Sequence, residues 1–124
     1  MTTTNKRTER AYGRRGELTA PIAREIVEGA RRALGGKLVS VVLYGSVARG
    51  DNDPESDVDI ALFVSDKLDW NEHDAMIHLF SRMCLDYDLE FSPLDIEQRK
   101  FQEWKDVIPF YHNIRKDGVV LWAA

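Results

Sequence analysis

Two aspartates separated by one residue, Asp57 and Asp59, are the side chains of this sequence best suited to chemistry. They stand at the start of an apolar run, 58–64, that is typical of a β-strand, so both project from the same face, about 6.7 Å apart along the chain. At that separation two carboxylates repel by roughly 2–3 kcal/mol at an effective dielectric constant near 20. A divalent cation reverses this repulsion, and Mg²⁺ prefers carboxylate oxygens. The pair therefore indicates a magnesium site.

A glycine–serine pair, Gly45-Ser46, interrupts a second apolar run rich in β-branched residues, 38–44. Glycine lets the backbone approach a ligand closely, and the serine hydroxyl is a further donor. If the next residues begin a helical turn, their free N–H groups form an anion site. Arg49 can add a charged contact to a phosphate, although a surface arginine without a ligand fits the sequence equally well.

The two features stand in a fixed relation, because Gly45-Ser46 is followed by ten residues and then by Asp57-Val58-Asp59. This pattern resembles the signature of the polymerase beta superfamily of nucleotidyltransferases, and most closely its minimal nucleotidyltransferase (MNT) group, which includes the MntA-like antitoxins often paired with HEPN-domain proteins. The motif covers about residues 38–65. The order of strands and helices extends the resemblance loosely to Gly118.

The resemblance implies a set of roles for these residues. Gly45 and Ser46 would hold the phosphates of ATP or another nucleoside triphosphate. Asp57 and Asp59 would be catalytic and would hold two Mg²⁺ ions. A nucleoside monophosphate, AMP if the substrate is ATP, would then pass to a hydroxyl acceptor. The family usually adds a third carboxylate from a later strand, for which Asp88 is the first choice as catalytic residue and metal ligand, with Glu90 second.

The partner implied by the resemblance is a HEPN-type toxin that accepts AMP on a tyrosine. The small size of the domain leaves little chain to hold a second substrate, so a second copy of this chain could complete the cleft instead. The alternative is a catalytically weak or inactive antitoxin, a binding module that neutralises its partner by forming a complex. Nucleic-acid binding through the basic N-terminus ranks lowest, because residues 51–106 carry 5 basic and 16 acidic side chains. By contrast, residues 1–50 carry 10 basic and 4 acidic side chains.

The elements expected around the motif define a small α/β (α+β) domain. Helical patterns begin at Thr19, Asp69 or Asn71, Asp95 and Pro109, and the first and last of them end at Gly35 and Gly118. Strands are expected at 38–44, 58–64 and about 87–94, with an edge strand or a flap at 119–122. We predict the polymerase-beta-like fold, a short mixed sheet with helices packed against it. A single domain, 19–124, would follow a flexible basic tail, 1–18.

Length and composition bound the remaining choices. With 124 residues, 44% hydrophobic and 31% charged, the chain has the size and composition of one globular domain. No apolar run approaches the ~18 residues of a membrane span, and the N-terminus lacks a signal-peptide core. Cys84 is the only cysteine, which excludes an internal disulfide. These features predict a cytoplasmic protein with no membrane partner.

Overall fold

A four-stranded mixed sheet forms the centre of the computed structural model, which describes residues 18–53 and 55–124. The strand order is β3-β2-β1-β4. The strands are β1 (Leu38–Tyr44), β2 (Val58–Val64), β3 (Phe91–Glu97) and β4 (Val119–Ala123). β1 pairs antiparallel with β2 and with β4, whereas β2 and β3 are parallel. The predicted α/β fold with a short mixed sheet is confirmed, and the segment at 119–122 is an edge strand.

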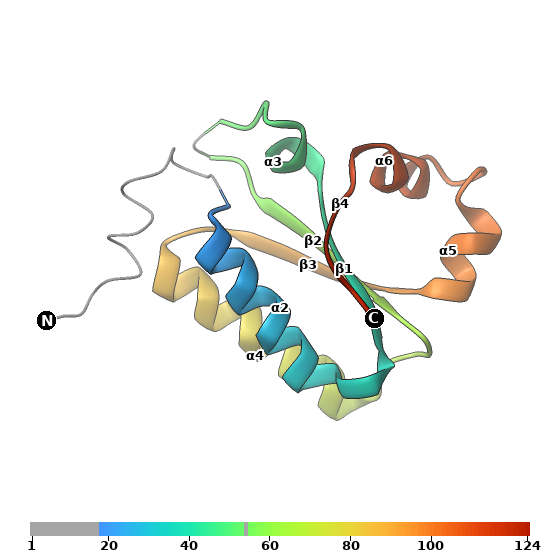
Figure 1. Ribbon diagram of the computed structural model, residues 1–124, viewed down its shortest axis with the longest axis horizontal. Helices are drawn as coiled ribbons and strands as arrows, with labels where there is room; N and C mark the ends of the chain where they lie inside the picture. The colour runs from blue at the N-terminus through green and yellow to red at the C-terminus, as the bar shows by residue number, and fades with distance from the viewer. Residues whose placement is uncertain (1–17, 54) are drawn as a thin grey trace, which may run out of the picture.

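Two long helices, α2 (Ala20–Leu34) and α4 (Trp70–Tyr87), lie side by side on one face of the sheet (Figure 1). Asp69 caps α4, because its side chain accepts from the Glu72 N–H while the Glu72 carboxylate accepts from the Asp69 N–H. The core on this face combines apolar residues of both helices and alternate residues of the strands: Ile22, Ile26, Ala30, Met76, Phe80, Met83, Val41, Leu43, Val58, Ile60, Leu62 and Val64.

The shorter helices α5 (Gln98–Trp104) and α6 (Pro109–Asp117) cover the opposite face (Figure 1). A smaller core forms there from Val42, Ala61, Phe63, Ile96, Phe101 and Ile114. Gly118 ends α6, as predicted, and its N–H donates to the carbonyl of Ile114. Because successive strand residues face opposite sides, Asp59 lies on this second face with Ala61 and Phe63.

Two boundaries differ from the prediction. The strand expected at 87–94 is β3 at Phe91–Glu97, because α4 continues through Tyr87 and then ends at Asp88 in the left-handed conformation, with φ 54°. Tyr87 is buried on the helical face of α4 that also carries Met83. Asp95, expected to open a helix, lies inside β3 opposite Leu62, and α5 begins three residues later.

The tail predicted at 1–18 lies outside the described residues except for Leu18, which packs against the core. Among the helices that the structure describes, none combines the length and the apolar character needed to cross a bilayer.

Candidate functional site

The two aspartates lie where β2 begins, on the face of the sheet covered by α5 and α6. Asp59 stands in the middle of a row across three neighbouring strands, opposite Tyr44 of β1 and Ser92 of β3. Asp57 directly precedes β2, and its Oδ2 accepts a hydrogen bond of 2.9 Å from Ser92 Oγ. Two carboxylates and one hydroxyl therefore gather at one end of the sheet.

The charge on Asp59 is poorly accommodated by its surroundings. Partial burial, and secondly the negative charge of Asp57, raise the pKa of Asp59 above its usual 3.8, and the Arg49 cation offsets only part of this effect. On the other side of the row, burial and then the charge of Asp59 raise the pKa of Tyr44. Among the described side chains, the site thus holds more negative charge than its neighbours neutralise. A cation is the simplest group that would compensate for it.

The glycine–serine corner contacts Asp59 directly. Gly45 has φ +79°, and a Cβ added to it would overlap Asp59 Oδ2. Gly45 also begins the five-residue helix α3 (Gly45–Arg49), so the strand turns into a helical turn as the sequence indicated. Only glycine fits here without strain or displacement of the carboxylate, because it lacks a Cβ and accepts positive φ. The predicted corner and the predicted acid pair are therefore neighbours in space.

Arg49 lies at the end of α3 and joins it to α6. Its Nε donates to Asp51 at 3.1 Å, and one terminal nitrogen donates to Asp117 at 2.9 Å. The Arg49 side chain is 44% exposed, whereas that of Asp117 is 14% exposed. The guanidinium is thus held near the aspartates by a carboxylate of α6 while part of it stays open to a ligand.

The third carboxylate, expected at Asp88 or Glu90, stays a prediction. Asp88 is the exposed residue after α4, and Glu90 is exposed just before β3. Within residues 18–53 and 55–124, no three His, Cys, Asp or Glu side chains are grouped so that they could hold a metal ion. Of the two candidates, Glu90 is the one whose backbone lies beside the pair, because its carbonyl accepts a hydrogen bond of 2.8 Å from the N–H of Val58, between the aspartates.

Sequence reasoning missed Ser92 and Tyr44. Neither residue belongs to the Gly-Ser or Asp-x-Asp pattern, and both come to the site through strand pairing. A strand beginning at Phe91 in parallel pairing with β2 would have placed Ser92 beside Asp59. The misplaced boundary between α4 and β3 hid that signal.

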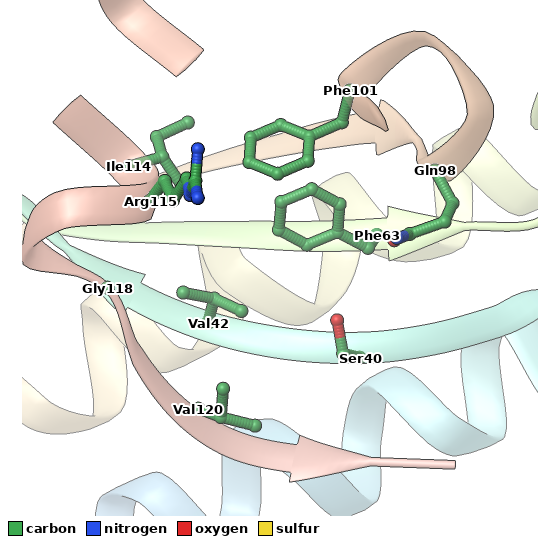
Figure 2. Close-up of a pocket in the computed structure, with 9 residues that line it drawn as sticks. All are labelled: Ser40, Val42, Phe63, Gln98, Phe101, Ile114, Arg115, Gly118 and Val120. Atoms are coloured by element: carbon green, nitrogen blue, oxygen red, sulfur yellow. The ribbon is translucent and has the colours of Figure 1, made fainter. Parts of the chain in front are cut away.

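A pocket of about 190 Å³ lies further along the same face of the sheet (Figure 2). Its lining residues are Ser40, Val42, Phe63, Gln98, Phe101, Ile114, Arg115, Gly118 and Val120. Phe63 and Phe101 pack edge to face there, with ring centroids 4.8 Å apart. The pocket contains no carboxylate, so it does not offer the oxygen ligands that the end of the sheet at Asp59 provides.

Residues 34–124 match the family model described as polymerase beta nucleotidyltransferase, which spans all four strands and the Gly-Ser and Asp-x-Asp pattern. The chain belongs to this nucleotidyltransferase family. Two curated proteins of Methanocaldococcus jannaschii, provisionally named protein adenylyltransferases, are similar to it. MJ0141 is 40% identical over 73 residues, covering 59% of this chain and 74% of the relative. MJ0604 is 30% identical over 99 residues, covering 80% of this chain and 93% of the relative.

Solved structures share the nucleotidyltransferase fold. A chain of a toxin–antitoxin crystallised with AMP-PNP has a TM-score of 0.58 at 22% identity, covering 82% of this chain and 73% of that chain. A chain from the complex of tri-AMPylated Shewanella oneidensis HEPN toxin with MNT antitoxin has a TM-score of 0.54 at 20% identity. The match covers 82% of this chain and 70% of that chain. A Sulfolobus solfataricus protein, provisionally described as a nucleotidyltransferase, has a TM-score of 0.51 at 20% identity. The match covers 99% of this chain and 90% of that protein.

Proposed function

We propose that this nucleotidyltransferase is a Mg²⁺-dependent adenylyltransferase that moves AMP from ATP to a hydroxyl group of a partner protein, a tyrosine of a HEPN-type toxin. The observation that carries the proposal is the contact of Gly45 with Asp59, which joins the glycine–serine corner to the acid pair. The names of the relatives and structural neighbours give the direction of the transfer, since they include protein adenylyltransferases and an AMPylated toxin. A cytoplasmic location, where ATP is available, goes with this proposal.

The side chains present fit a magnesium ion. Asp57 and Asp59 would hold it, because hard divalent cations prefer carboxylate oxygens and Mg²⁺ tolerates an open, partly hydrated site. The raised pKa of Asp59 is the second argument, since this carboxylate lacks a full counter-charge among the residues that the structure describes. When bound, the ion would neutralise developing charge on the phosphate oxygens of the reaction.

The chain's own residues would orient the nucleotide. Gly45 leaves room for the Asp59 carboxylate at the corner, and Ser46 and Arg49 would donate hydrogen bonds to the triphosphate. In the reaction, the acceptor oxygen would form a bond to the α-phosphorus as the bond to the bridging oxygen of the β-phosphate breaks. Pyrophosphate would leave, and the hydroxyl proton would pass to water.

The test follows the label from two forms of ATP. The chain is incubated with Mg²⁺, the protein encoded next to its gene, and ATP labelled on the α- or on the γ-phosphate. We expect label on the partner from α-labelled ATP alone, and its loss on adding EDTA or on changing both Asp57 and Asp59 to alanine. Label from γ-labelled ATP would indicate phosphorylation instead, and label that survives the double change would refute the assignment.

A second candidate function is a binding module that neutralises its partner by forming a complex. It is favoured by the finding that no three His, Cys, Asp or Glu side chains of the described residues are grouped so that they could hold a metal ion. In that case the complex forms and survives the double alanine change, and no label reaches the partner in either experiment. Size-exclusion chromatography of the mixture, run beside the labelling, distinguishes the two functions.

Changing Arg49 to glutamine is expected to raise the KM for ATP about tenfold, because a charge-assisted contact to phosphate is lost. The thermal stability should fall only slightly, since the ion pair with Asp51 is exposed to solvent and the ion pair with Asp117 is exposed on the Arg49 side. The measurement is the KM for ATP beside a melting curve. Arg99 is an exposed arginine of α5, so Arg99→Gln is the matched control. An equal KM in the two variants would exclude a phosphate contact for Arg49.

A further inference from the structure

Within residues 18–53 and 55–124, Ser92 carries the one hydroxyl that is hydrogen-bonded to the acid pair. Its Oγ donates to Asp57 Oδ2 at 2.9 Å, and its backbone pairs with Asp59 across the parallel β2–β3 ladder. A single serine is thus linked to both aspartates, to one through its side chain and to the other through its place in the sheet. Ser92 itself is half-buried, which limits the positions open to its hydroxyl.

The contact with Ser92 matters because Asp57 is otherwise weakly held. Asp57 lies outside β2 and is exposed, so the strand does not restrain its side chain as it does that of Asp59. A hydrogen bond from a hydroxyl to a carboxylate oxygen is charge-assisted and stronger than a bond between neutral groups. By holding Oδ2, Ser92 restricts rotation of the Asp57 carboxylate and leaves its other oxygen available.

The hydroxyl also sets the charge of the site. With Ser92 in the row, the two carboxylates carry two negative charges, which one divalent cation balances. A carboxylate in the same place would add a third negative charge, and cation affinity in oxygen sites rises with the number of charged ligands. A two-carboxylate site is therefore expected to hold a free cation weakly.

We propose that Ser92 is a positioning residue of the cation site, which orients Asp57 through Oδ2 and keeps the site at two negative charges. This inference rests on the proposed function, because it assumes that Asp57 and Asp59 bind a cation. It adds a residue from β3 to the site and specifies that the free cation binds weakly. Ser92 contributes by holding a carboxylate and does not need to contact the reacting atoms.

The test measures Mn²⁺ binding in the absence of nucleotide, with the free ion followed by electron paramagnetic resonance. Ser92→Ala is expected to weaken binding by about tenfold, the lower end of the effect of removing a residue that orients a metal ligand. Ser92→Thr keeps the hydroxyl and should restore the affinity. Ser92→Asp should tighten binding by about tenfold, because it adds a charged oxygen ligand.

Ser40→Ala provides the control, because Ser40 is a serine of β1 that lines the pocket on the same face, away from the aspartates. Melting curves with and without Mn²⁺ exclude a purely structural role. Without the ion, Ser92→Asp should have a lower melting temperature than the wild type. Added Mn²⁺ should raise the melting temperature of Ser92→Asp by more than it raises that of the wild type. Unchanged Mn²⁺ affinity in Ser92→Ala would overturn the role of Ser92 alone. No Mn²⁺ binding by the wild type at millimolar concentration would overturn both this role and the proposed cation site.

Discussion

Changing Asp59 to asparagine is expected to slow AMP transfer by about a thousandfold and, at neutral pH without metal, to make the protein more stable. The loss of rate follows because a cation at a phosphoryl oxygen supplies several kcal/mol of transition-state stabilisation, and about 1.4 kcal/mol corresponds to a factor of ten. Asparagine keeps the shape of the side chain but removes the charge that would hold the ion. Asp59→Asn is thus expected to lower the rate of AMP transfer and to raise the stability of the fold.

The gain in stability follows from the direction of the pKa shift. Burial and the nearby Asp57 raise the pKa of Asp59 in the folded protein above 3.8, so the folded state binds this proton more tightly than the unfolded state does. The stabilisation from protonated Asp59 is therefore complete below pH 3.8 and is lost as the pH rises through the raised pKa. At neutral pH the ionised carboxylate destabilises the fold, and asparagine removes this cost.

Urea unfolding at several pH values, with and without Mg²⁺, checks the stability of Asp59→Asn. The advantage of the variant over the wild type should be largest at neutral pH and should shrink as the pH falls toward 3.8. Added Mg²⁺ should stabilise the wild type but not the variant. Asp66→Asn is the control, since Asp66 is exposed beyond the other end of β2 and the amide oxygen can still accept from the Lys67 N–H. A variant less stable than the wild type at neutral pH would contradict the electrostatic account.

Changing Gly45 to alanine is expected to reduce AMP transfer by about a hundredfold, the effect of moving a reacting group by about 1 Å. The added Cβ would overlap Asp59 Oδ2, so either the carboxylate or the corner has to move. Alanine at φ +79° also carries backbone strain of about 1–3 kcal/mol. Gly45→Ala should therefore lose both activity and stability.

Gly50→Ala separates the two causes. Gly50 has φ +81°, close to the value at Gly45, but a Cβ added there meets no atom within 4 Å. This variant should show a similar loss of stability while keeping most of its activity. Initial rates and urea midpoints of the two variants provide the comparison. Equal activity losses would mean that backbone strain, and not the contact with Asp59, limits catalysis.

The central part of the fold follows directly from local sequence. The apolar runs Leu38–Tyr44 and Val58–Val64 became β1 and β2 with the predicted bounds, because β-branched residues favour strands and glycine or aspartate stands at their ends. The Gly-Ser and Asp-x-Asp pattern indicated the nucleotidyltransferase family from the same two strands. In this region, local preference and tertiary structure agree.

The passage from α4 to β3 could not be derived in the same way. Tyrosine is common in strands, but Tyr87 also follows Met83 by four residues, which is the spacing of one helical face. Tyr87 is helical because that face of α4 is buried in the core. Asp88 then ends the helix at positive φ, which aspartate tolerates better than most residues do. Sequence reasoning therefore considered only Asp88 and Glu90 for the third oxygen of the site and did not anticipate that the register of β3 also brings Ser92 to the pair.

The position of β4 has a consequence for how molecules of this protein meet one another. β4 pairs with β1 and makes β1 an inner strand, although β1 leads directly into Gly45. An unpaired strand edge is a template for addition of a strand from another chain. A chain shortened before Val119 would expose β1 to such cross-chain addition, and aggregation would then begin at the strand that supports the glycine–serine corner. With β4 in place, the open edge on this side of the sheet belongs to β4, and β1 is shielded from strand addition.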